Sequence, residues 1–132
     1  MQSKKWIVLA AVFGLTGVAA GALGAHALQD RLDPKELASY DVAVRYQMYH
    51  ALALLAVAWL SSETSSRLTN ASGWCFASGV VCFSGSIYGL IFLSWRWLGP
   101  ITPLGGLLFM TGWLLLGIVG MTGRKNTRTD GA

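Results

Sequence analysis

The stretch that decides the fold is DVAVRYQMYHALALLAVAWL, residues 41–60. Its second half is apolar enough for a membrane helix, whereas its first half carries an arginine, two tyrosines, a glutamine and a histidine. Polar groups at membrane depth are costly, so each needs a hydrogen-bonding partner, a water-filled cavity or a function. We therefore expect a membrane helix that turns its polar residues toward other helices.

The whole chain has the composition of a membrane protein. Of its 132 residues, 54% are hydrophobic and 12% are charged, whereas a soluble domain carries about 25% charged residues. Apolar stretches near the roughly 20 residues that a spanning helix needs are Trp6–Leu28, Ala43–Leu60, Ser72–Leu93 and Ile101–Met121. They predict an all-α, four-transmembrane-helix bundle running up-down-up-down. It would be a single domain over residues 1–121, with a polar, disordered cytoplasmic tail over residues 122–132.

The basic residues predict the orientation of this bundle. The net charge is +4, but the basic residues are scattered at helix ends and form no stripe for nucleic acid. Four spans would place both termini and a loop at residues 61–71 on one side. Because that side carries more basic residues, the positive-inside rule predicts that both termini are cytoplasmic. The inner basic residues would be Lys4, Lys5, Arg67, Arg124, Lys125 and Arg128, and the outer ones Arg31, Lys35, Arg45 and Arg96.

The second helix has a clear start signal before its apolar part. Asp33 is in the N-cap position, Pro34 follows at N1, and Glu36 at N3 can complete a capping box. We therefore expect this helix to begin near Pro34. Asp41 and Arg45, four residues apart on it, would form an interfacial ion pair.

The first apolar stretch has an alternative interpretation. Two lysines, an apolar run and Ala25-His26-Ala27 are typical of a secretory signal with its cleavage site. The run continues to Leu28, however, and three more apolar stretches follow. We therefore expect the stretch to be retained as the first helix, with cleavage as the alternative.

Glycines mark the faces through which we expect helices to pack. In lipid, such small residues let two helix backbones approach closely. We expect these faces to pack against other helices of the same chain, and a homodimer contact is the alternative. The residues are Gly14, Gly17, Gly21 and Gly24 in the first helix and Gly85 and Gly89 in the third.

Three parts of the chain resemble a known family when taken together: GALGAHAL (21–28), VRYQMYHALALL (44–55), and FSGSIYGL with PITPLGGLLFMTGWLLL (83–90 and 100–116). They resemble the small bacterial inner-membrane family catalogued as domain of unknown function 423, and an animal small mitochondrial transmembrane protein is similar. The resemblance extends from about Gly14 to Leu116, with Leu23 where relatives have phenylalanine. It implies the fold and a location in the inner membrane. The family has no established activity, so no catalytic residue is transferred. The motif positions are Gly24, His26, Tyr46, Gln47, His50, Ser84, Gly85, Ser86, Thr102, Pro103 and Gly105.

Polar residues near the outer ends of the expected helices form the candidate site. All four outer ends would lie on one side of the membrane, so these side chains could converge in one layer of the outer leaflet. The alternative for each is an ordinary hydrogen bond that joins neighbouring helices. The candidates are His26, Arg45, Tyr46, Gln47, His50, Ser84, Ser86, Tyr88 and Thr102.

Three classes of function remain compatible with this pattern. The first, which we expect, is an accessory or scaffold protein that packs against lipid, its own copies or a larger membrane complex through Gly-rich faces. The second is an oligomeric transporter or channel for a small solute or proton, using Arg45, Tyr46 and His50. Its weakness is that no broken-helix pair of the transporter kind is present.

The third class is a redox protein that binds haem or a quinone through His26 and His50. Two histidines at different depths suit a bis-histidine haem poorly. The sequence contains no phosphate-binding loop, no H-E-x-x-H and no G-x-S-x-G. We therefore expect no enzymatic activity, no metal, no cofactor and no nucleic-acid partner.

Overall fold

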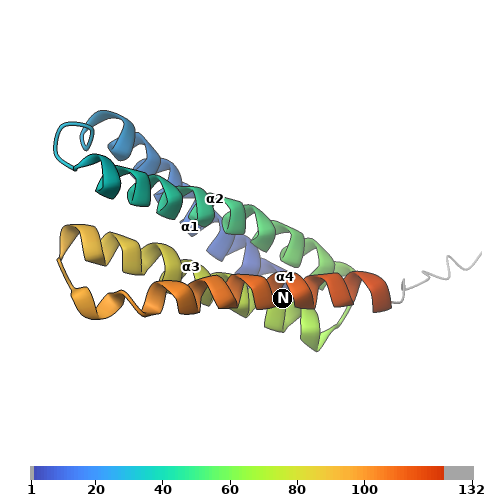
Figure 1. The fold of residues 1–132 in the computed structure, drawn as a ribbon. Helices are drawn as coiled ribbons and strands as arrows, with labels where there is room; N and C mark the ends of the chain where they lie inside the picture. Colours follow the sequence, from blue (N-terminus) through green and yellow to red (C-terminus); the bar gives the residue numbers. More distant parts are fainter. Residues whose placement is uncertain (1, 124–132) are drawn as a thin grey trace, which may run out of the picture.

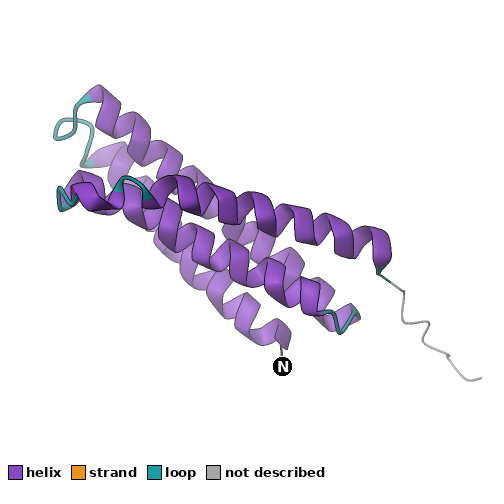
Figure 2. Ribbon diagram, turned by 60° about the horizontal axis from the view of Figure 1, so that its bottom comes forward, coloured by secondary structure: helices purple, strands orange, loops and turns teal. Residues whose placement is uncertain are grey.

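The computed structural model describes residues 2–123, which form helices and connecting loops without a strand (Figure 2). The elements are α1 (Gln2–His26), α2 (Pro34–Glu63), α3 (Arg67–Phe92), the short 3₁₀ helix η1 (Arg96–Leu98) and α4 (Ile101–Thr122). The all-α expectation is confirmed. Most of the tail expected at residues 122–132 lies outside the described residues, so the division at residue 121 stays a prediction.

The start of α2 is capped as predicted. The Asp33 carboxylate accepts a hydrogen bond from the Glu36 backbone N–H at 2.8 Å, and the Glu36 carboxylate accepts one from the Asp33 N–H at 3.2 Å. With Pro34 at the first helical position, α2 begins two turns before the apolar segment. Its 30 residues span about 45 Å, which exceeds the roughly 30 Å hydrocarbon core.

The loop expected at residues 61–71 is much shorter in the structure. α2 continues to Glu63 and α3 begins at Arg67. The Thr64 hydroxyl donates to the Leu60 carbonyl at 3.2 Å, and the Ser66 hydroxyl accepts from the Leu68 N–H at 3.2 Å. Side-chain caps therefore allow both helices to extend into a segment that looks like a polar loop.

The four α-helices run antiparallel as two hairpins. The α1–α2 and α3–α4 connections lie at one end, and the start of α1, the α2–α3 loop and the end of α4 lie at the other (Figure 1). α1 packs on α2, α2 on α3, and α3 on α4. α2 and α3 are therefore the central pair. We call the end that holds the two hairpin connections the connection end.

Three segments are long and apolar enough to cross a membrane: α1, α3 and the segment Arg96–Thr122, which combines η1 with α4. α2 is not among these candidate spans, which differs from the expectation of four. The physical reason is the polar half of α2, where an arginine, a glutamine and a histidine interrupt the apolar run. The chain is therefore an all-helical protein with several apolar helices.

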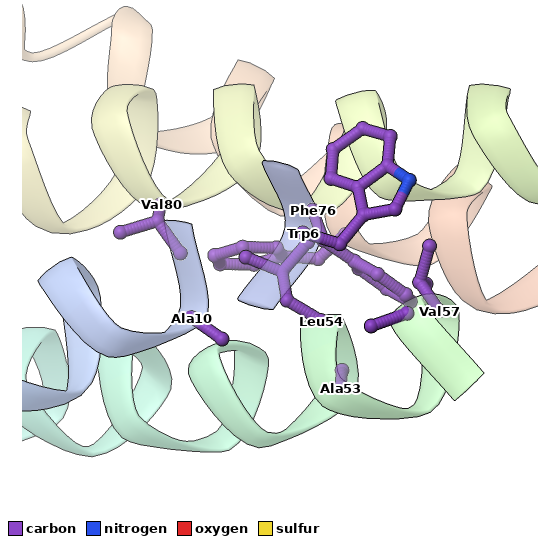
Figure 3. Packing of buried hydrophobic residues seen from close by; sticks show 9 residues of the cluster. Trp6, Ala10, Ala53, Leu54, Val57, Phe76 and Val80 are labelled. Atoms are coloured by element: carbon purple, nitrogen blue, oxygen red, sulfur yellow. The ribbon is translucent and has the colours of Figure 1, made fainter. Parts of the chain in front are cut away.

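The buried apolar core lies toward the end opposite the hairpin connections. Trp6 of α1 is fully buried beside Leu54 and Val57 of α2 and Phe76 of α3 (Figure 3). The indole of Trp6 rests on Gly73, where a Cβ would lie 2.6 Å from the ring. This contact joins α1 to α3 near the start of each helix.

Several glycines allow close helix contacts, although not all of the expected ones. A Cβ at Gly17 or Gly24 of α1 would overlap side chains of α2, and one at Gly89 would overlap Leu98 of η1. Nothing lies within 4 Å of a Cβ at Gly14 or Gly85, so those two do not pack as expected. Four further glycines that pack against aromatic residues are Gly73, Gly79, Gly105 and Gly112.

Gly105 of α4 lies directly against the backbone of α3. A Cβ there would lie 2.4 Å from the backbone nitrogen of Phe83 in α3. Only a residue without a side chain lets these two backbones come so near. This contact sets how α3 and α4 hold the polar residues between them.

Candidate functional site

Gln47 joins three helices within the bundle. Its side chain is only 5% exposed. The amide nitrogen donates to the Phe13 carbonyl at 3.0 Å and to the Thr16 hydroxyl at 2.8 Å, both in α1. The amide oxygen accepts from the Tyr88 hydroxyl of α3 at 2.8 Å. Both amide hydrogens and the carbonyl oxygen are thus used within the protein, which makes this glutamine a link between helices.

Two serines of α3 make a second set of links. The buried Ser84 hydroxyl donates to the Ala43 carbonyl of α2 at 2.6 Å. The Ser86 hydroxyl lies 2.9 Å from the Phe83 carbonyl and 2.5 Å from the Thr102 hydroxyl of α4. α3 is therefore bonded to both of its neighbours near the connection end.

His50 joins α2 to α4 and has no free ring nitrogen. Nδ1 lies 2.7 Å from the Tyr46 carbonyl, and Nε2 lies 3.1 Å from the indole Nε1 of Trp113. A carbonyl can only accept and an indole N–H can only donate, so the imidazole is neutral with its proton on Nδ1. The ring also stacks on Phe109 at 3.6 Å between centroids. With 4% of its surface exposed, His50 is buried between α2 and α4 and links them.

The other candidates do not join these contacts. His26, at the end of α1, is exposed, and its side chain makes no hydrogen bond within residues 2–123. Arg45 is also exposed and forms an ion pair with Asp41, one turn earlier on α2, as expected. Tyr46 is 39% exposed and packs its ring near Phe83 and His50. The structure thus brings Gln47 to Tyr88 and Ser86 to Thr102, whereas His26 and Arg45 lie outside these links. Their convergence in one layer of the outer leaflet stays a prediction.

Sequence reasoning missed four residues that complete these links. Thr16 and Trp113 bind Gln47 and His50, as described above. The Tyr40 hydroxyl donates to the Ala20 carbonyl of α1 at 2.5 Å, and the Ser72 hydroxyl donates to the Gly112 carbonyl of α4 at 2.8 Å. Each is a polar side chain in or beside an apolar helix. Because an unpaired polar group in lipid is costly, the sequence could have indicated that each of them needs a partner.

The hydrogen bonds between helices limit which ligands the polar side chains inside the bundle could bind. Within residues 2–123 no group of three or more His, Cys, Asp or Glu side chains could hold a metal ion. The lone pair of His50 that could bind a haem iron already accepts the hydrogen bond from Trp113. The internal polar side chains are therefore arranged to hold helices together.

Proteins that are similar to this chain in sequence are named as membrane proteins. The family model described as "Protein of unknown function (DUF423)" matches residues 20–106. A UPF0382 membrane protein of Staphylococcus epidermidis is 45% identical over 113 residues, which cover 86% of this chain and 92% of that protein. The UPF0382 membrane protein YwdK of Bacillus subtilis is 40% identical over 114 residues, covering 86% of this chain and 93% of that protein.

No solved structure matches the chain. The relatives are named as membrane proteins, and three segments of this chain are long and apolar enough to cross a membrane. The chain is thus a small multi-pass membrane protein, and it belongs to the DUF423 family, whose relatives carry the name UPF0382 membrane protein.

Proposed function

We propose that this protein is a non-catalytic accessory subunit of the membrane, which crosses the bilayer four times and packs its outer faces against a larger membrane protein or lipid. The observation that carries the proposal is the pairing of the internal polar groups. Gln47, Ser84 and His50 each bond to a group on a neighbouring helix. Polar side chains that satisfy one another stabilise a bundle, and the ring nitrogens of His50 and the amide of Gln47 have no position left for a substrate.

The connectivity supports a fourth crossing by α2. α1 ends and α3 begins at opposite ends of the bundle (Figure 1). If α1 and α3 each cross, α2 must return between them through the same depth. Its polar residues at 47 and 50 turn inward, while Leu52, Leu55 and Trp59 turn outward. An inward-facing polar residue with partners costs far less in lipid than its hydropathy alone indicates.

The pairing also weighs against a transport pathway. The apolar core around Trp6, Leu54 and Phe76 fills the bundle beyond the polar links. A proton carried through the chain would need a titratable group with a free position, and both nitrogens of His50 are occupied. We therefore place the functional surfaces on the outside of the bundle.

The orientation is testable by reporter fusion. We propose that both ends lie in the cytoplasm, since the basic residues near them outnumber those at the connection end. A reporter that is active only in the cytoplasm should be active when fused after Ala132 and inactive when inserted after Arg31. The reverse pattern would overturn the orientation.

Purification of the full chain in mild detergent tests the accessory role. Replacement of Gly14, Gly85 or Gly117 by leucine places a bulky side chain on three different outer faces, where a Cβ meets no atom within 4 Å. The bundle should stay folded, and at least one variant should reduce recovery of a partner that co-purifies in fixed proportion with the unaltered protein. A protein that purifies alone and supports a proton flux that His50→Ala abolishes would overturn the proposal.

A further inference from the structure

A lateral groove runs along the surface between α2 and α4, over the link between His50 and Trp113. Its volume is about 780 Å³, within the roughly 300–1,000 Å³ of small-molecule sites. One wall is a single face of α2 and the other a single face of α4. The residues that matter here are Tyr46, Tyr49, Gly106, Met110 and Trp113. With Met110 69% exposed, the groove opens sideways, toward lipid.

The floor of the groove is aromatic and rigid. Phe109 stacks against His50 with 6° between the ring planes, and Tyr46 lies 5.0 Å from Phe83. The hydrogen bond from Trp113 to His50 closes its lower end. Flat, fixed rings of this kind offer a large contact surface to a hydrocarbon chain without a loss of side-chain entropy.

A second groove continues this one toward the connection end. It has a volume of about 790 Å³, and Val42 of α2 lines both grooves. Lys35, Ser39 and Thr102 lie on its walls together with apolar residues of α3. From Lys35 to Tyr49 the path along α2 is about 21 Å at 1.5 Å per residue. That length equals about half of a 40–45 Å bilayer, that is, one leaflet with its headgroups.

The charges at the mouth favour an anionic group. Lys35 makes no ion pair within residues 2–123, where the only one joins Arg45 to Asp41. The carboxylate of Glu36 also lines this groove, but it bonds to the Asp33 N–H in the capping box and forms no ion pair with Lys35. An ammonium on a flexible stem is a common partner of phosphate.

We propose that the joined grooves bind one glycerophospholipid of the adjoining leaflet. Its phosphate lies at the Lys35 ammonium and one acyl chain runs past Val42 onto the aromatic floor. The match in length, the cation at the mouth and the apolar floor together select a phospholipid over a soluble ligand. This site goes beyond the general packing of outer faces against protein or lipid, because it holds a single lipid at defined residues.

The glycines of α4 provide a matched pair of variants. A Cβ at Gly106 or at Gly117 meets no atom within 4 Å, and only Gly106 lines the groove. Gly106→Leu should fill the groove and Gly117→Leu should leave it empty. Both replace glycine by leucine in the same helix, so their effects on helix propensity are alike.

Native mass spectrometry of the delipidated full chain in maltoside detergent tests the site. Phosphatidylglycerol should bind at one molecule per chain. Lys35→Gln should weaken binding by about tenfold, as loss of a charge-assisted hydrogen bond predicts. Gly106→Leu should abolish the single bound lipid, and Gly117→Leu should retain it.

Three results would overturn the site. The first is a lipid count that Gly106→Leu and Gly117→Leu change equally, which would place the lipid on the general surface. The second is diacylglycerol binding as tightly as phosphatidylglycerol, which would remove the phosphate contact. The third is a dimer of this chain that Gly106→Leu dissociates, which would show that a second copy of the chain occupies the groove. None of these results bears on whether a protein partner co-purifies, so the accessory role is tested separately.

Discussion

Gly105→Ala should destabilise the bundle, although alanine is the better helix former. The new Cβ would lie 2.4 Å from the Phe83 nitrogen and 2.8 Å from its Cα. Ordinary contact begins at 3.4 Å, so the backbones of α3 and α4 must separate by about 1 Å. A backbone cannot rotate away as a flexible side chain can, and the shift would strain the Ser86–Thr102 contact nearby.

The expected magnitude follows from two opposing effects. Overpacking costs about 1–3 kcal/mol, and here the upper part of that range applies because two of the three clashing atoms belong to the backbone and the third is the Cβ fixed to it. Replacement of glycine by alanine within a helix returns about 1 kcal/mol. The net loss in the free energy of unfolding should be about 1–2 kcal/mol.

The adjacent glycine provides the control. A Cβ at Gly106 meets nothing within 4 Å, so Gly106→Ala should keep the propensity gain of up to about 1 kcal/mol. The two variants should therefore differ by about 2–3 kcal/mol when helix content is followed by circular dichroism during denaturation in mixed micelles. Equal stability of the two variants would refute the close approach of α3 and α4.

Four further substitutions test the links between helices and the start of α2. Gln47→Leu and Tyr88→Phe should each destabilise the protein, and their double-mutant cycle should give a coupling of about 0.6–1.7 kcal/mol; additive effects would contradict the hydrogen bond. Trp113→Phe should cost about 1 kcal/mol because it leaves Nε2 of His50 unpaired, and it should shift the imidazole nitrogen resonances in NMR, whereas unchanged resonances would remove that link. Asp33→Ala should cost about 0.5–2 kcal/mol through loss of the cap, measured as a lower midpoint of thermal unfolding, and an unchanged midpoint would show that α2 is held by packing alone.

The family name and the helix links support different conclusions about this protein. The relatives are named only as membrane proteins, so identity supports the class of protein and not an activity. The structure adds that the polar motif residues Gln47, His50 and Ser84 face neighbouring helices and hold them. Motif positions of this kind are explained by packing in lipid, where satisfied polar contacts replace the hydrophobic effect as the force between helices.

Composition and local pattern were enough to predict the helices and the capping box at Asp33. Apolar length and cap chemistry are properties of neighbouring residues, so they can be read along the chain. The polar half of α2 lowers its hydropathy below that of a membrane span, so hydropathy alone does not predict that this helix crosses.

Which polar residue meets which partner depended on how the helices pack. The apolar run of α4 gives no local sign that Trp113 donates to His50, and nothing near Gly105 shows that it lies against the backbone of Phe83. Likewise, His26 belongs to the same motif set as Gln47, yet it lies exposed at a helix end while Gln47 is buried. Such pairings join residues far apart in the chain, and they follow from the rotation and spacing of whole helices, which local patterns do not encode.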